Sequence, residues 1–276
     1  MRAKSYPKAS EEDIAYIIQM LGTIYPLSES LQQELYENIL TLQLPQNQIL
    51  LEQGEVCNYI YFIKKGAIMG YSIHNRKKIT TYISIENEFV SSITGLHGAA
   101  PSKETIVAVI PSLLLAIRND VIQELLKTHF DLNFIFRVII EQYYRDAQER
   151  AHIVRIGNAR ERYMYFMQTK SGRIERLPEE SIASLLDIKL ITLTRLKKQF
   201  GMQAVKKQEA EQLFRQIDSY ILANQLYKNK KISLASLSAE LDITSHKLSS
   251  LINDNCHLTF LDYINSNRIN SIKEQM

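Results

Sequence analysis

Residues 59–66, which read Tyr59-Ile60-Tyr61-Phe62-Ile63-Lys64-Lys65-Gly66, decide the fold class of this chain. Aromatic and β-branched residues closed by a turn signal are typical of a β-strand. Similar short runs lie on both sides, at residues 48–51, 67–72, 79–85, 105–110 and 113–117, and turn residues separate them at 53–55, 65–66, 74–75 and 110–112. Many short strands at near-regular spacing predict an antiparallel sandwich or barrel over about residues 42–117.

Apolar residues at helical spacing flank this region. Residues 11–41 predict two helices, because Pro26 interrupts the spacing and Ser28 suits the cap of the second helix. After residue 117 we expect a short helix from about Asn119 and a long one over about 131–153. An apolar stripe runs along the long helix, formed by Phe134, Ile135, Val138, Ile139, Gln142 and Tyr143. Such a stripe packs either inside the chain or against the same helix of a second copy.

The remaining 120 or so residues read as short helices. We expect them at 159–168, 179–186, 189–200, 211–226, 234–241, 245–253 and 259–273. Residues 182–188 and 237–243 share a pattern, in which a leucine ends a helix, an aspartate follows and an isoleucine precedes the next helix. Asp tolerates the left-handed conformation better than most residues. Each stretch therefore indicates either a DNA-binding helix-turn-helix or a generic helical hairpin.

Composition and charge limit the class of protein. The chain has 276 residues, enough for about two domains, with 45% apolar and 23% charged residues, a balance typical of globular proteins. The net charge is +3, but residues 151–200 contain ten Lys and Arg against five Asp and Glu. A basic excess in one segment is expected of a nucleic-acid contact.

Sequence signals for metals, membranes and export are missing. Cys57 and Cys256 are far apart, no histidine has zinc spacing beside either, and we expect free thiols and no metal or other cofactor. The polar N-terminus does not resemble a signal peptide, and no apolar run approaches the length of about 20 residues that a membrane span needs. These features predict a soluble cytoplasmic protein with no membrane partner.

Residues 1–200 resemble the Crp/Fnr family of transcription regulators. Residues 53–66 resemble the start of its cyclic-nucleotide-binding β-roll, and residues 86–90 and 101–106 resemble the middle of that roll. Residues 159–163 resemble the entry to the family's DNA-binding domain. Residues 177–198 resemble its helix-turn-helix, with Thr194-Arg195 at the usual pair of a small residue and an arginine. The resemblance implies a homodimer joined through the long helix at about 131–153.

The candidate ligand residues of the roll depart from the family's pattern. Members that bind cyclic AMP use a Gly-Glu pair for the ribose and an Arg-Ser pair for the phosphate, whereas this chain has Ser91-Ser92 and Ser102-Lys103 at those places. Arginine binds phosphate with two parallel hydrogen bonds, and lysine does so less specifically. We therefore expect that the roll does not bind cyclic AMP, and that any effector is an unknown small molecule.

The resemblance also assigns the candidate DNA contacts. Arg195 is the best candidate for a guanine contact, because arginine pairs with the major-groove edge of guanine. Lys189, Thr192 and Thr194 are further candidates, and Lys197 and Lys198 suit phosphates. The recognition helix opens with the apolar Leu190-Ile191, and no strand-rich wing follows Phe200, so we expect low sequence specificity.

Residues 215–276 resemble part of the AraC-type DNA-binding domain, through residues 234–243, 245–252 and 260–269. That family has two helix-turn-helix units joined by a helix, and here only the first unit and the beginning of the joining helix are present. The segment therefore serves as an auxiliary DNA contact, packs in a dimer or is a remnant.

Together these patterns predict an α+β protein. Its parts are a cyclic-nucleotide-binding-like antiparallel β-roll at 1–130, a dimerisation helix at 131–156, a Crp-type helix-turn-helix at 157–200 and a partial AraC-like one at 201–276. The favoured function is a dimeric transcription regulator that binds double-stranded DNA. The alternative is a protein–protein interaction module with vestigial DNA binding. No glycine-rich phosphate loop or catalytic constellation indicates an enzyme.

Overall fold

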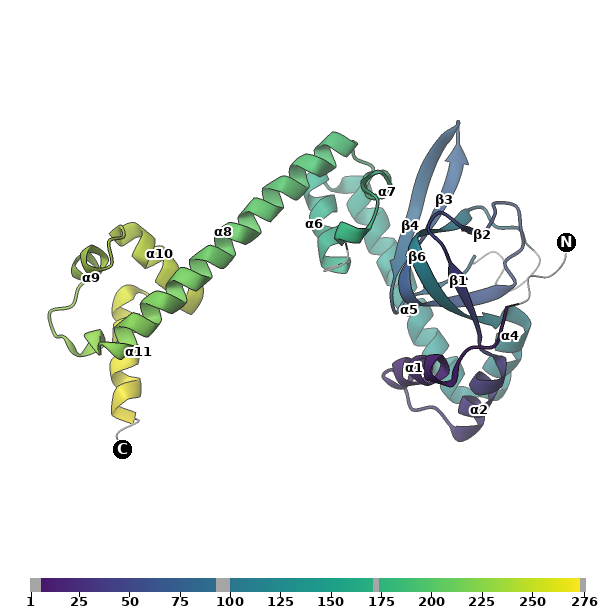
Figure 1. Ribbon diagram of the computed structural model, residues 1–276, viewed down its shortest axis with the longest axis horizontal. Coiled ribbons are helices and arrows are strands. Elements are labelled where there is room, and N and C mark those ends of the chain that lie inside the picture. Colours follow the sequence, from purple (N-terminus) through teal and green to yellow (C-terminus); the bar gives the residue numbers. More distant parts are fainter. Residues whose placement is uncertain (1–5, 93–99, 171–173, 274–276) are drawn as a thin grey trace. The chain divides into compact units, whose positions relative to one another are not determined.

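The computed structural model describes residues 6–92, 100–170 and 174–273. The chain forms two compact units, Met1–Leu196 and Lys197–Met276 (Figure 1). None of the described helices is long and apolar enough to span a lipid bilayer.

A single antiparallel sheet forms the β-roll of the first unit. Its strands are β1 (Leu40–Leu44), β2 (Ile49–Leu51), β3 (Tyr59–His74), β4 (Lys77–Ile85), β5 (Phe89–Val90) and β6 (Thr105–Arg118). The main order is β1-β6-β3-β4, with β2 paired to β6 and β5 paired to β3. Apolar side chains from all of these strands except β4 form the buried core of the roll, and Tyr82 of β4 packs against it. The expected α+β class with an antiparallel roll is confirmed.

Two of the expected turns prove to be bulges inside long strands. The runs 59–63 and 67–72 belong to one strand, β3, and the runs 105–110 and 113–117 belong to one strand, β6. The two strands pair from Tyr59 to Tyr71 of β3, with register shifts between Ile63 and Ile68. Gly66 and Pro111 mark these sites, because glycine readily adopts the positive φ that a bulge can require, and proline, which lacks an N–H, is tolerated where the ladder of hydrogen bonds is interrupted.

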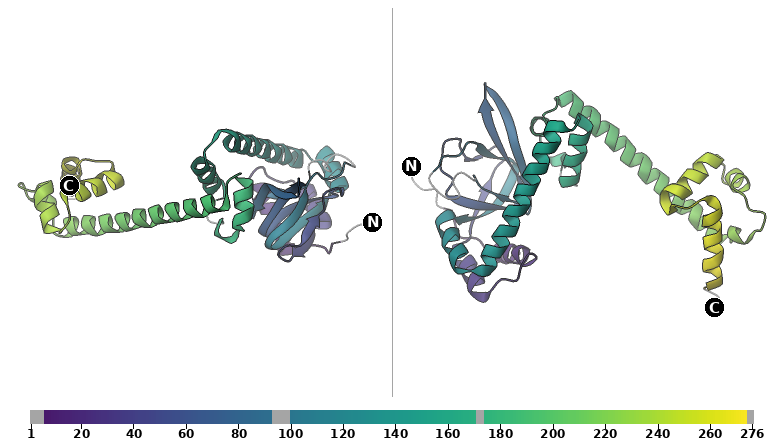
Figure 2. Two further views of the ribbon diagram at one scale, coloured as in Figure 1. Left: turned by 90° about the horizontal axis from the view of Figure 1, so that it is seen from above. Right: turned by 180° about the vertical axis from the view of Figure 1, so that it is seen from behind.

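Four of the described helices pack against the roll. They are α1 (Glu11–Gly22), α2 (Glu29–Asn38), α4 (Asn119–Thr128) and α5 (Phe130–Ile156). Ser28 caps α2 as expected, and its backbone N–H and hydroxyl both donate at 2.7 Å to the buried carboxylate of Asp131. Buried residues of α1, α2, α4 and α5 form one core with Phe62 and Leu115 of the sheet. The long helix α5 therefore lies along the roll (Figure 2).

A small helical segment completes the first unit. It contains α6 (Ala159–Thr169), a short 3-10 turn at Ile174–Arg176, α7 (Glu179–Leu185) and the start of α8 (Leu190–Ala223). The α7 helix packs on strand β4, where the backbone N–H of Thr80 donates to the hydroxyl of Ser184 at 2.9 Å.

The expected helices at 189–200 and 211–226 are one continuous helix, α8, of 34 residues. The expected break between them was wrong. Glycine inside a helix costs only about 1 kcal/mol relative to alanine, and the residues around Gly201 are mostly good helix formers. No strand follows Phe200 among the described residues, as expected.

The described residues of the second unit form helices joined by short turns. It contains the remainder of α8, a 3-10 turn at Leu226–Lys228, α9 (Leu234–Glu240), α10 (Ser245–Cys256) and α11 (Phe260–Lys273). Its core combines one face of α8 with the buried sides of the three short helices, for example Ile221, Leu248 and Ile264.

Candidate nucleic-acid interface

The α7–α8 pair has the geometry of a helix-turn-helix. Asp187 adopts the left-handed conformation, with φ of 51°, and so redirects the chain between the two helices. The backbone N–H of Leu186 donates to Ile182 at 3.0 Å, and that of Ile188 donates to Ala183 at 3.0 Å. These bonds use the last carbonyls of α7, which would otherwise lack partners, and they fix the angle at which α8 begins.

Arg162 holds this turn from the side. The side chain of this α6 residue donates to the carbonyl oxygens of Leu186 at 3.1 Å and Asp187 at 3.0 Å, and to Gly157 at 2.8 Å. One guanidinium group thus ties the end of α5 to the turn before α8. The sequence resemblance included Arg162 but assigned it no role, because the contact joins residues 24 and 25 positions apart.

The first turns of α8 present one buried and one exposed side. Leu193 and Leu196 are buried. On the other side Lys189, Arg195 and Lys198 are exposed. Three cations therefore lie near the N-terminal end of one helix, which also has the positive end of its dipole there. This arrangement can contact both phosphates and base edges of duplex DNA.

The other predicted contacts are less available. Thr192 and Lys197 are half-buried. Thr194 is exposed, but its hydroxyl lies 3.1 Å from the carbonyl oxygen of Leu190 and 3.3 Å from the carboxylate of Glu179. Ile191 was not predicted as a contact, although 77% of it is exposed at the same end of the helix. An apolar side chain there can touch a thymine methyl group but reads no hydrogen-bond pattern.

The second unit repeats the geometry of the first helix-turn-helix 55 positions later. Asp242 corresponds to Asp187 and has φ of 52°. The backbone N–H of Leu241 donates to Leu237, and that of Ile243 donates to Ser238, each at 3.0 Å, in the same pattern as around Asp187. Leu248 is fully buried, like Leu193 at the corresponding position. The similarity that the sequence indicated is therefore a real structural repeat.

The exposed side of α10 carries polar residues. His246, Lys247 and Ser250 are exposed there, and the hydroxyl of Ser250 donates to Asp254 at 2.9 Å. Lys247 is the only cation of this helix. The exposed side of α10 accordingly carries less positive charge than the first turns of α8.

One of the two predicted ligand pairs of the roll lines an open hollow. Ser102 and Lys103 contribute to an open hollow with Gln53, Gly54, Ala100 and Pro101. The hydroxyl of Ser102 donates to the backbone carbonyl of Glu104 at 2.7 Å, which leaves the exposed Lys103 as the available polar side chain of the pair.

The other predicted pair does not line this hollow in the described part of the chain. The Ser91 hydroxyl donates to the carbonyl of Tyr59 at 3.1 Å, and Ser92 is buried.

The described residues hold no group of three or more side chains that could bind a metal ion. Cys57 is buried, and its thiol donates to the carbonyl of Tyr59 at 3.2 Å. Burial raises the pKa of the Cys256 thiol, and Asp218 adds to this effect. Neither environment favours a reactive thiolate.

Known proteins share parts of this architecture. Residues 41–129 match the family model of the cyclic nucleotide-binding domain. No curated protein matches the chain in sequence. Several solved structures do match in fold. FixK2 from Bradyrhizobium japonicum has 13% identity and a TM-score of 0.53, and the match covers 60% of this chain and 86% of that one.

Two further solved structures are similar. The c-di-GMP-responsive global regulator CLP of Xanthomonas campestris has 13% identity and a TM-score of 0.50, with 64% of this chain and 93% of that one covered. A protein described as a Crp/Fnr-family transcriptional regulator from Eubacterium rectale has 15% identity and a TM-score of 0.50, with 64% and 85% covered. Residues 41–129 are thus a cyclic nucleotide-binding-type domain, and the chain shares the fold of Crp/Fnr-type regulators over more than half of its length.

Proposed function

We propose that this protein is a DNA-binding transcription regulator that reads duplex DNA with the first turns of α8. The observation that carries the proposal is the exposed group of Lys189, Arg195 and Lys198 on a helix-turn-helix. Arg195 contacts a base edge, and Lys189 and Lys198 contact phosphates. The predicted contacts Thr192, Thr194 and Lys197 have supporting roles, because each is half-buried or already hydrogen-bonded. Solved regulators of the same fold support this function.

The regulator acts as a homodimer joined through α5. Ile140 and Tyr144 lie about one helical turn apart on α5. Ile140 is 43% exposed and Tyr144 is 64% exposed. Large apolar side chains at this spacing suit a seam between two copies of the same helix. A dimer also suits DNA binding, because it presents two recognition helices, and helices about one DNA turn apart can bind a palindromic site.

Cyclic AMP is not the effector. A phosphate that entered the hollow of the roll would meet Lys103 in place of an arginine and a Ser102 hydroxyl that already bonds the backbone. A single flexible lysine binds phosphate without the paired hydrogen bonds of a guanidinium group. Any small-molecule effector of the roll therefore differs from cyclic AMP.

The α9–α10 pair serves as an auxiliary DNA contact. Its turn repeats that of α7–α8, and His246, Lys247 and Ser250 occupy the exposed side of α10. Its single lysine suits a weak, supplementary interaction.

A salt titration tests the main proposal. Mixed genomic DNA fragments are bound to the wild-type protein and to the variants R195A and K198A at rising salt concentrations. We expect binding to weaken with salt, K198A to reduce the slope of log K against log salt by about one, and R195A to remove the preference among fragments. The alternative, a protein–protein interaction module, predicts no binding even at low salt.

A further inference from the structure

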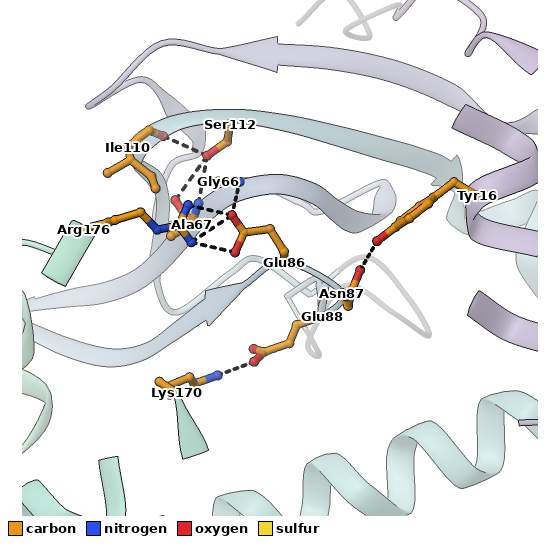
Figure 3. A network of polar contacts seen from close by, with 10 residues as sticks. All are labelled: Tyr16, Gly66, Ala67, Glu86, Asn87, Glu88, Ile110, Ser112, Lys170 and Arg176. Carbon is orange, nitrogen blue, oxygen red and sulfur yellow. Dashed lines mark hydrogen bonds and ion pairs between the residues drawn. The ribbon is translucent and has the colours of Figure 1, made fainter. Parts of the chain in front are cut away.

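A short acidic turn of the roll connects to three different parts of the first unit. This acidic turn consists of Glu86, Asn87 and Glu88 (Figure 3) and joins β4 to β5, whose first residue is Phe89. Asn87 adopts the left-handed conformation, with φ of 70°, and so sends Glu86 and Glu88 toward different partners.

Glu86 is fixed from two sides. The guanidinium group of Arg176 donates to both carboxylate oxygens, at 3.0 and 2.9 Å, from the 3-10 turn just before α7. The backbone N–H of Gly66 donates to the same carboxylate at 3.0 Å from the bulge in β3. The ion pair therefore joins the sheet directly to the helix-turn-helix segment.

Glu88 and its neighbours make the other connections. Glu88 pairs with Lys170 at the end of α6, and only 28% and 16% of these side chains are exposed. The amide oxygen of Asn87 accepts a hydrogen bond from Tyr16 of α1 at 2.7 Å. The backbone N–H of Phe89 donates to the Tyr143 hydroxyl of α5 at 2.7 Å, and the same hydroxyl donates to the carbonyl of Phe89.

The contacts that hold the helix-turn-helix segment leave its recognition side uncovered. Arg176 and Lys170 lie before α7, and Ser184 faces Thr80 of the sheet, whereas Arg195 and Lys198 are exposed. The acidic turn thus holds the back of the segment and does not compete with DNA for the recognition helix.

We propose that Glu86 and Glu88 are positioning residues for DNA binding, which hold the helix-turn-helix at a fixed orientation to the roll and to α5. This inference rests on the proposed function. A dimer joined through α5 binds two half-sites at once only if each recognition helix keeps its orientation to α5. Loss of the ion pairs lets the segment move. After the first recognition helix has bound its half-site, the second helix then has a lower effective concentration at the other half-site.

The test uses the full chain and exchanges the charges of one pair. The single variants E88K and K170E each set two like charges against each other, and the double variant E88K/K170E restores an ion pair in reverse order. R176Q removes the other pair. R118Q is the matched control, because Arg118 forms an ion pair with Asp120 in which both side chains are well exposed.

Hydrogen exchange, measured in the absence of DNA, reports on the contact between the helix-turn-helix segment and the sheet. Peptides that cover β4 and α7 are followed by mass spectrometry, since the Thr80 amide is protected by Ser184 of α7. We expect exchange of the β4 peptide to rise about tenfold in both single variants and in R176Q, as a partly buried charge pair suggests. The double variant and R118Q should exchange like the wild type.

DNA affinity reports on the positioning. The probes are the tightest genomic fragment from the salt titration and the two halves of that fragment. We expect the single variants to bind the whole fragment at least tenfold more weakly but each half with unchanged affinity, and the double variant to recover.

Two results overturn the proposal, namely unchanged exchange in the single variants or equal weakening for whole and half fragments. A wild-type protein that binds no DNA fragment overturns the proposed function. The exchange experiment then still decides whether the acidic turn holds the helix-turn-helix on the sheet.

Discussion

The substitution G66A tests how the bulge in β3 is built. Gly66 has φ of +106°, a conformation that side chains rarely adopt, and a Cβ atom there would lie 2.2 Å from the Ser112 hydroxyl and 2.6 Å from the Cα atom of Ser112. The backbone strain costs about 1–3 kcal/mol. Overpacking against strand β6 adds about 1–3 kcal/mol. We expect a loss in the free energy of unfolding of about 3–5 kcal/mol, since the backbone is the part that must move.

Urea-induced unfolding, followed by far-ultraviolet circular dichroism, measures this loss. With a slope of about 2 kcal/mol per M, the midpoint of the first unit should fall by about 1.5–2.5 M. The control is G201A, because Gly201 lies inside α8 and a Cβ atom added there would have no neighbour within 4 Å. Alanine there should stabilise the helix by about 0.5–1 kcal/mol. A G66A midpoint within about 0.5 M of the wild type refutes the reasoning.

Three further substitutions have defined outcomes. D131N should lower the free energy of unfolding by about 2 kcal/mol at pH 7 in urea titrations, because the carboxylate accepts two bonds from Ser28. Burial by itself raises the pKa of the Asp131 carboxyl, but its hydrogen bonds lower the pKa more, so that the pKa in the folded protein lies below 3.8. The difference in unfolding free energy between the wild type and D131N should therefore persist above pH 3.8 and vanish as the pH falls through the lowered pKa. R162A should speed hydrogen exchange in residues 182–190 and weaken DNA binding, because the Arg162 side chain holds the turn. Exchange as slow as in the wild type would contradict this role of Arg162. Y144E should convert the dimer to a monomer in light scattering, and an unchanged mass would exclude the α5 seam.

Local patterns predicted the elements well. Helix caps and left-handed turn residues act over three or four positions, so Ser28 and the two aspartates at 187 and 242 could be recognised from the sequence. The repeat of the helix-turn-helix was visible for the same reason. Lys65-Gly66 also marked an irregular site correctly, but the sequence does not say whether a strand ends there or continues past a bulge.

Long-range pairs were missed. Glu86 and Arg176 are 90 positions apart, and nothing in the pattern around either residue indicates that they meet. The resemblance of Ser91 and Ser102 to ligand residues also gave no sign that their hydroxyls donate to backbone carbonyls. The length of α8 was also missed, because a glycine weakens a helix without ending it when the flanking residues favour the helix.

Selection from random duplex DNA tests the central claim most directly. The full chain and the variant R195A are each used to enrich bound sequences at about 0.15 M salt, which suppresses non-specific phosphate binding. The wild type should enrich an inverted repeat with half-site centres about 10 base pairs apart, or a multiple of that spacing, and R195A should lose the preference at one position of each half-site. Enrichment of no common sequence by the wild type, or of the same sequence by R195A, would contradict the assignment of α8 as the helix that reads DNA.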